Sequence, residues 1–125
     1  MGKAVLGALI AAVIIKLFLF DLIIAEGDSM EPVIHSGAVL VINRLQYGFR
    51  FPGQPGYLLR WGVPRQGEVV VFYTPSGKLA VKRCGLPVEK GYFTALGDNS
   101  LQSYDSRSYG PVPVDKITGK VLGIK

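Results

Sequence analysis

The N-terminal segment limits most strongly what this chain can fold into. From Ala4 to Ala25 it reads AVLGALIAAVIIKLFLFDLIIA, and only Lys16 and Asp21 interrupt the apolar run. As a helix that rises about 1.5 Å per residue, the stretch is long enough to cross the roughly 30 Å hydrocarbon layer of a membrane. A buried core helix is the alternative, but the rest of a 125-residue chain is too small to enclose one. The sequence therefore predicts a transmembrane anchor within residues 1–25.

The charges in and around this segment predict its orientation. The stem of Lys16 can extend along the helix toward the membrane interface. A cleavable leader is disfavoured because the span is too long. Lys3 and the α-amine precede the segment, whereas Glu26 and Asp28 follow it. The positive-inside tendency thus predicts a single-pass protein of the cytoplasmic membrane, with its N-terminus in the cytosol and the remainder outside.

The rest of the chain has the pattern of short strands and turns. Its β-like runs are rich in valine, and glycine and proline separate them. TPSG has the composition of a turn between the second and third runs, which predicts a hairpin. No helical period of useful length follows the anchor, so residues 26–125 are expected to form an all-β domain, a small barrel or coiled sheet. The runs are AVLVIN (38–43), EVVVFYT (68–74), KLAVKRC (78–84), GYFTAL (91–96) and ITGKVLGIK (117–125).

The stretch YGFRFPGQPGYLLRWGVP (47–64) is aromatic, rich in glycine and too irregular for a core strand. Two interpretations stay open. In one, the loop folds over the end of the barrel, and Trp61 and the phenylalanines form its small core. In the other, it is an apolar lip that enters the membrane interface, where Trp and Tyr are favoured.

Charge and cysteine content exclude several classes of protein. The net charge of +5 comes from 14 Lys and Arg against 9 Asp and Glu, but the basic residues are scattered, which argues against nucleic-acid binding. A single cysteine, Cys84, and a single histidine, His35, leave no intramolecular disulfide and too few soft ligands for structural zinc. Cys84 is predicted to be a small buried side chain.

Ser29, in the turn sequence GDS, has two interpretations. Such a serine is ordinarily a turn or cap residue. Its place just beyond the predicted anchor makes it a candidate nucleophile, which needs a base to activate its hydroxyl. By residue type, that base is either His35 or a lysine.

Lys82 is the lysine of interest. Strand alternation places it on the same face as Ala80 and Cys84, which are small and uncharged. If that face is buried, desolvation lowers the pKa of the ammonium, and the neutral amine can accept a proton. If the hairpin face is exposed, Lys82 is an ordinary surface lysine, and alternation alone does not decide between the two.

Sequence blocks that occur in a fixed order point to a known family. They are GDSMEP (27–32), GAVLVINRLQYG (37–48), GEVVVFYTPSGKLAVKRCGLP (67–87) and LGDNSLQSYDSRSYGPV (96–112). Together they resemble the type I signal peptidases, membrane-anchored serine/lysine proteases that remove signal peptides from exported proteins. The resemblance implies that Ser29 is the nucleophile and Lys82 the general base, with no cofactor and no metal.

The last block implies a set of supporting residues. Ser103 corresponds to the family serine whose hydroxyl orients the catalytic amine. Asp105 and Arg107 correspond to an ion pair near the reactive groups, and Asp98 to an aspartate that pairs with Arg83. Without the resemblance, these residues would be turn residues and solvated charges.

The resemblance also implies a substrate. A preprotein signal peptide would lie extended beside a strand edge, with small side chains at −3 and −1, and we assign Met30, Pro32 and Val81 to substrate contact. The Ser29 backbone N–H is one candidate donor to the oxyanion. Gly27 departs from relatives that carry an oxyanion-binding serine there, so either a second donor comes from elsewhere or the oxyanion is held more weakly. The alternatives are a specialised Ser/Lys processing peptidase of a secretion or conjugation system, and a catalytically silent membrane protein that binds signal peptides.

Overall fold

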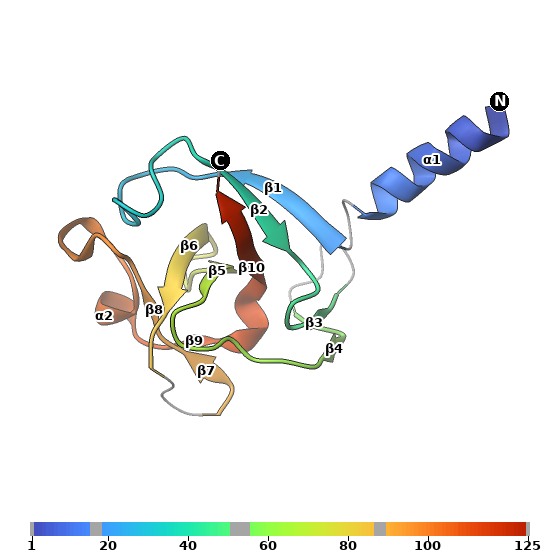
Figure 1. Ribbon diagram of the computed structural model, residues 1–125. Coiled ribbons are helices and arrows are strands. Elements are labelled where there is room, and N and C mark those ends of the chain that lie inside the picture. Colours follow the sequence, from blue (N-terminus) through green and yellow to red (C-terminus); the bar gives the residue numbers. More distant parts are fainter. Residues whose placement is uncertain (1, 16–18, 51–55, 87–89, 125) are drawn as a thin grey trace.

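The computed structural model describes residues 2–15, 19–50, 56–86 and 90–124 (Figure 1). An N-terminal helix, α1 (Gly2–Ile14), projects from a β-domain that contains the rest of the described chain. The expected all-β domain is therefore confirmed. Lys16, for which an extended stem was predicted, lies outside the described residues.

The apolar N-terminal run is not one continuous helix, so the prediction of a helix from Ala4 to Ala25 is wrong in its second half. Strand β1 (Phe20–Ile24) pairs antiparallel with β2 (Val39–Asn43), with Leu22 opposite Val41. The physical reason is that β2 offers an edge whose backbone groups β1 can pair, and FDLII has the aromatic and β-branched residues that strands favour. Among the described residues, no helix combines the length and apolar character needed to cross a membrane.

A six-stranded sheet, in the order β1-β2-β10-β5-β6-β8, is the main element of the domain. Every pairing in it is antiparallel. Two pairs of short strands, β3-β4 and β7-β9, lie outside this sheet. The remaining strands are β3 (Gly48–Phe49), β4 (Leu59–Arg60), β5 (Val69–Tyr73), β6 (Leu79–Cys84), β7 (Tyr92–Phe93), β8 (Ala95–Leu96), β9 (Val112–Pro113) and β10 (Ile117–Ile124). The short helices are the 3-10 turns Ser100–Gln102 and Val114–Lys116, and α2 (Ser106–Tyr109).

The predicted hairpin is confirmed in β5 and β6. Its turn is closed by a hydrogen bond from the Thr74 N–H to the Lys78 carbonyl, 2.8 Å long, and Gly77 takes a φ of 85° that glycine adopts without strain. The register sets Lys82 opposite Val70, whose side chain is fully buried. Because paired residues project to the same side of a sheet, Lys82 points into the domain.

Two clusters of buried side chains form the core, on either side of the sheet's central strands. In the larger cluster, the rings of Phe72 and Phe93 meet edge to face at a centroid distance of 5.3 Å, and Cys84 is buried there as predicted. The smaller cluster includes Met30, which is only 4% exposed. Met30 thereby fixes the turn that carries Ser29 against the sheet. The larger cluster is Tyr47, Val70, Phe72, Cys84, Phe93, Ala95, Val112, Val114 and Ile117, and the smaller one is Ala25, Met30, Ile34, Leu40, Ile42 and Val71.

The aromatic stretch 47–64 is partly ordered by the pairing of β3 with β4. Tyr47 is buried, but Trp61 is 55% exposed, and its indole N–H donates to the Leu45 carbonyl at 3.0 Å. The interpretation of Trp61 as the centre of a small loop core is therefore wrong, because the ring is held at the surface by this hydrogen bond. Phe51 lies outside the described residues.

Candidate active site

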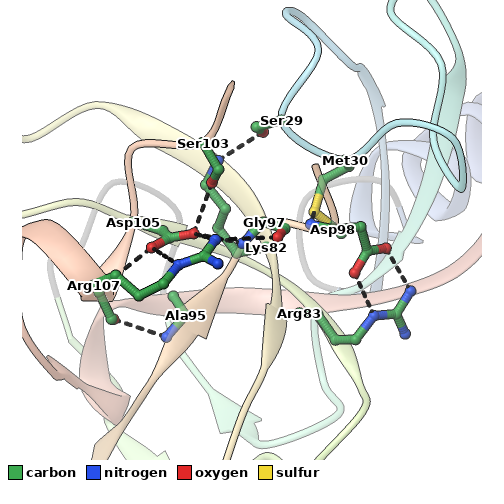
Figure 2. A network of polar contacts seen from close by, with 11 residues as sticks. Ser29, Met30, Lys82, Arg83, Ala95, Gly97, Asp98, Ser103, Asp105 and Arg107 are labelled. Carbon is green, nitrogen blue, oxygen red and sulfur yellow. Dashed lines mark hydrogen bonds and ion pairs between the residues drawn. The ribbon is translucent and has the colours of Figure 1, made fainter. Parts of the chain in front are cut away.

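Ser29 and Lys82 meet at the end of the hairpin strand β6, although they are far apart in the sequence. The Oγ of Ser29 lies 2.6 Å from the Nζ of Lys82, within hydrogen-bonding distance (Figure 2). Ser29 sits in the turn after β1, and Lys82 projects from β6. The two residue types that the sequence paired as candidate nucleophile and base are thus in direct contact.

Lys82 has an environment that favours its neutral form. Lys82 is only 6% exposed, so of the two interpretations that strand alternation left open, the buried one is correct. Burial lowers the pKa of Lys82; the nearby Asp105 carboxylate opposes this, Arg107 adds to it, and the net pKa lies below the ordinary lysine value. A lowered pKa makes the neutral amine more accessible than in a surface lysine, and the neutral amine has the lone pair that can accept the serine proton.

His35, the other candidate base, lies elsewhere. Its side chain is 73% exposed, and its Nδ1 lies 2.5 Å from Glu31 Oε2. Both groups belong to the turn region after Ser29, and their contact is a local pair one helical turn apart in the sequence. The structure therefore brings a lysine to Ser29 and directs the histidine to the surface.

Asp105 is the centre of the polar network beneath Lys82 (Figure 2). Its carboxylate is fully buried and accepts hydrogen bonds from the Ser103 hydroxyl at 2.7 Å and from the Gly97 N–H at 2.7 Å. Arg107 donates to it from its backbone N–H at 3.0 Å and from its guanidinium at 2.5 Å, so the predicted ion pair is present. Burial alone would raise the pKa of Asp105, but the hydrogen bonds from Arg107, Gly97 and Ser103 outweigh it and lower the pKa.

Ser103 is connected to Asp105. The resemblance implied that its hydroxyl orients the lysine amine, whereas the hydrogen bond that the structure gives this hydroxyl runs to the carboxylate of Asp105. That carboxylate is close enough to Lys82 to raise its pKa. The geometry therefore links Ser103 to the amine through Asp105.

Arg83 and Asp98 form the second predicted pair. The guanidinium donates to both carboxylate oxygens at 2.8 Å, a bidentate arrangement, and also to the Gly67 carbonyl at 2.8 Å. The backbone N–H of Asp98 lies 3.4 Å from the sulfur of Met30. This pair thus ties β6 to the segment that faces the Ser29 turn (Figure 2).

Two residues of this segment were missed by the sequence reasoning. A Cβ on Gly97 would lie 2.0 Å from Ser103 Oγ and 2.8 Å from the Ser29 carbonyl oxygen, so only glycine fits. Asn99 donates to the Ser29 carbonyl from its backbone at 2.8 Å and to the Asp28 carbonyl from its side chain at 3.0 Å. Glycine and asparagine are ordinary turn residues, and the only signal that could have singled them out was their place in the GDN block beside Ser103.

A groove of about 440 Å³ leads up to Ser29 and Lys82. One wall is the end of β1 with the following turn, and the other is the first part of β6. Met30 and Val81 lie in its lining, whereas Pro32 is exposed and lies outside it. The lining residues are Ile23, Ile24, Ala25, Glu26, Gly27, Ser29, Met30, Leu79, Ala80, Val81 and Lys82.

A serine hydroxyl against a buried lysine amine, at the end of a groove between sheet edges, is the arrangement of a serine hydrolase with a lysine base. The sequence profile of the signal peptidase family, peptidase S26, matches residues 1–90 and 84–124 of this chain. The chain belongs to that family.

Individual relatives agree with this assignment. Signal peptidase I T of Bacillus subtilis is 27% identical, over 94% of this chain and 80% of its own length. Mitochondrial inner membrane protease subunit 1 of Xenopus tropicalis is 31% identical, over 83% of this chain and 68% of its own length. Signal peptidase I of Pseudomonas aeruginosa is 28% identical, over 98% of this chain and 42% of its own length.

Proposed function

We propose that this chain is a serine endopeptidase that removes signal peptides from exported preproteins, with Ser29 as its nucleophile and Lys82 as its general base. The observation that carries the proposal is the 2.6 Å contact between Ser29 Oγ and the Nζ of a lysine that is 6% exposed. An amine in that setting is neutral more readily than a surface lysine, and a neutral amine accepts a proton.

Catalysis then begins with acylation. The Ser29 hydroxyl transfers its proton to Lys82 Nζ as Oγ attacks the carbonyl carbon of the scissile peptide bond. The carbonyl oxygen becomes an oxyanion, for which the Ser29 backbone N–H is a donor. When the tetrahedral intermediate collapses, the C–N bond breaks and the Lys82 ammonium returns its proton to the leaving amine. The product is an ester between Ser29 and the signal peptide.

Deacylation repeats these steps with water as the nucleophile. Lys82, neutral again, takes a proton from water as the oxygen attacks the ester carbonyl, and it then gives that proton to Ser29 Oγ. The signal peptide leaves with a free carboxyl group. The Asp105 network supports this cycle by fixing the charges and donors around the amine.

The substrate proposal rests on the groove and its two strand edges. In the part of the chain that the structure describes, β8 pairs with β6 at Arg83 and Cys84 and no strand pairs with the same edge at Leu79–Lys82, which leaves that edge for a further strand. β1 is the terminal strand at the other end of the sheet. We infer that an extended signal peptide lies between them, makes backbone hydrogen bonds, and places small side chains at −3 and −1 against Met30 and Val81. Pro32 is left out of this contact because it lies outside the groove.

We further propose that the N-terminal segment holds the enzyme at the cytoplasmic membrane, with its N-terminus in the cytosol and the β-domain outside. Helix α1 has no buried residue, and its apolar side chains are exposed on all faces. Leu22 and Ile24 on the outward side of β1 are 67% and 64% exposed. Lipid is the partner that removes both surfaces from water.

The proposed function predicts cleavage of a purified preprotein in detergent. The wild-type chain should release a mature protein whose new N-terminus follows an Ala-X-Ala type sequence, and Ser29→Ala should release none. N-terminal sequencing of the product identifies the bond. A panel of preproteins distinguishes a general signal peptidase from a dedicated processing enzyme. Equal cleavage by wild type and Ser29→Ala would contradict the proposal.

The rate of cleavage should rise with pH. Below the pKa of Lys82 the amine is an ammonium with no lone pair, so kcat/KM should fall as pH falls. Because the pKa is lowered by burial, the midpoint of this acid limb should lie below 10.5, the ordinary lysine value. The measurement is kcat/KM for a soluble peptide between pH 5 and pH 11. A rate that does not depend on pH in this range would exclude Lys82 as the base.

Membrane attachment predicts flotation with lipid vesicles. The full chain should rise with vesicles of phosphatidylcholine and phosphatidylglycerol in a density gradient. A variant with Leu6→Asp and Ile10→Asp should partition at least about 100-fold less, because each buried carboxylate costs about 2.5–3.5 kcal/mol. Leu101→Asp, at a leucine that is 96% exposed outside the N-terminal segment, is the control. Unchanged flotation of the double variant would refute the anchor.

A further inference from the structure

Asn99 forms hydrogen bonds to the backbone on both sides of Ser29. Its backbone N–H donates to the Ser29 carbonyl oxygen at 2.8 Å, and its side-chain Nδ2 donates to the Asp28 carbonyl oxygen at 3.0 Å. The first bond fixes the peptide unit after Ser29, and the second fixes the peptide unit before it. Because each peptide unit is planar, Asn99 restrains both backbone dihedral angles of Ser29.

The side-chain bond also determines where the Ser29 N–H points. The peptide between Asp28 and Ser29 is trans, so its carbonyl oxygen and its N–H point in opposite directions. Holding the Asp28 oxygen toward Asn99 therefore turns the Ser29 N–H away from Asn99. Among the described residues, this N–H has no hydrogen-bond acceptor. It is a backbone donor kept free beside the nucleophile's own oxygen.

We propose that Asn99 is a positioning residue for the oxyanion: its side-chain amide holds the Asp28 carbonyl so that the Ser29 N–H is aimed at the oxygen that becomes negative during acyl transfer. This inference rests on the proposed function and adds a residue that positions the oxyanion donor. It matters in this chain because Gly27 has no side chain to donate a second hydrogen bond, so the transition state depends on the Ser29 N–H.

The expected decrease in kcat depends on which other groups hold the peptide unit between Asp28 and Ser29. The Glu31 N–H also donates to the Asp28 oxygen, at 3.2 Å, so loss of the Asn99 side chain loosens this peptide without releasing it. Complete removal of an oxyanion donor lowers kcat by about 10²–10³-fold. For Asn99→Ala we expect a smaller decrease, about 10-fold.

Asn99→Asp is the sharper variant. It keeps the shape of the side chain but replaces the donor amide by a carboxylate oxygen, which repels the Asp28 carbonyl oxygen. Its kcat should fall at least as far as that of Asn99→Ala. Because the variant is isosteric, it also keeps the test valid if Asn99→Ala does not fold. Asn43→Ala is the matched control, since Asn43 makes comparable hydrogen bonds to Gln46 and Leu45 at the end of β2.

The experiment measures kcat and KM of the full-length wild type, both Asn99 variants and Asn43→Ala on a soluble signal-sequence peptide, as a function of pH. The expected result is a lower kcat and an unchanged KM for both Asn99 variants, with Asn43→Ala equal to wild type. The acid limb should be unchanged in Asn99→Ala, which adds no charge near Lys82. An unchanged acid limb in Asn99→Ala shows that the contact of Lys82 with Ser29 is intact. A general disturbance of the site would break this contact and shift the limb.

Three results would overturn the inference. Wild-type kcat in both Asn99 variants would show that the Ser29 N–H does not depend on this contact. A raised KM with normal kcat would make Asn99 a ground-state binding residue. A shifted acid limb in Asn99→Ala would mean that Asn99 positions the serine–lysine contact instead. Failure of the wild-type chain itself to cleave, or cleavage that survives Ser29→Ala, would overturn the proposed function and is seen separately from these outcomes.

Discussion

Replacement of Lys82 by methionine is expected to lower kcat for preprotein cleavage by about 10³-fold or more, because among the described residues no other base contacts the Ser29 hydroxyl. Methionine has nearly the length of lysine and no charge, so it fits the same buried space. The melting temperature should stay equal or rise, because the variant no longer buries an amine that loses hydration on folding. Steady-state kinetics and thermal unfolding of the same preparation measure both effects.

Two control variants make this result specific. Lys120→Met removes a lysine that lies away from the groove and forms an ion pair with Glu68 at 3.0 Å. The kcat of this variant should equal that of wild type. His35→Ala removes the other base considered from the sequence, and its activity should also be kept. An inactive His35→Ala together with an active Lys82→Met would show that histidine is the base and that the contact seen at Ser29 has no catalytic role.

Replacement of Asp105 by asparagine is expected to destabilise the fold by about 2–4 kcal/mol and to disturb catalysis. The carboxylate accepts from the buried Gly97 N–H and the Ser103 hydroxyl, and it caps α2 at the Arg107 N–H. An amide cannot accept all of these hydrogen bonds, so buried donors are left without partners. Arg107 is 45% exposed and can turn to solvent, which keeps the cost below that of a fully buried ion pair. Chemical denaturation measures the loss.

The pH dependence of Asp105→Asn tests two effects of the Asp105 carboxylate, one on stability and one on the pKa of Lys82. Because the folded-state pKa of Asp105 is lowered, its stabilisation is complete above its ordinary pKa of 3.8 and declines as pH falls further, so the difference in unfolding free energy from wild type should shrink toward pH 2. Removing a negative charge near Lys82 lowers the pKa of the amine further, so the acid limb of the residual activity should move to lower pH.

Asp115→Asn is the matched control for this pair of measurements. Asp115 also pairs with an arginine, Arg60, at 3.3 Å, but its side chain is 63% exposed. Exposed ion pairs contribute about 0–1 kcal/mol, so the variant should be nearly as stable as wild type, and its acid limb should not move. Equal decreases in unfolding free energy in Asp105→Asn and Asp115→Asn would show that burial of the Asp105 network does not account for its contribution to stability.

The local patterns of the sequence were sufficient for the hairpin and for the face of Lys82. Period-two alternation in KLAVKRC and a turn at TPSG specify β5-β6 without reference to the rest of the chain. The apolar N-terminal run was different. Its residues suit a membrane helix and a strand almost equally, and the strand forms because the edge of β2, which lies outside the apolar run, pairs with β1. Hydrophobicity alone did not show where the helix ends.

The same distinction applies to the active site. Ser29, Lys82 and the paired charges of the last block were identified because their residue types have chemistry that the resemblance assigned. Gly97 and Asn99 were missed because their roles are geometric: one leaves room for Ser103, and the other holds the peptides around Ser29. A glycine or an asparagine in a turn has the same local pattern whether or not it faces a nucleophile.

The sequence by itself determined the β-class of the domain, the hairpin that carries Lys82 and the residue types needed for acyl transfer, because periodicity and turn chemistry act over a few neighbouring residues. The tertiary structure alone decided that the serine hydroxyl and the lysine amine touch, that the amine is buried, that the histidine is not, and that Phe20–Ile24 joins the sheet. Those outcomes depend on how distant segments share a core and pair their backbones, and neither of these is encoded in any short stretch of the chain.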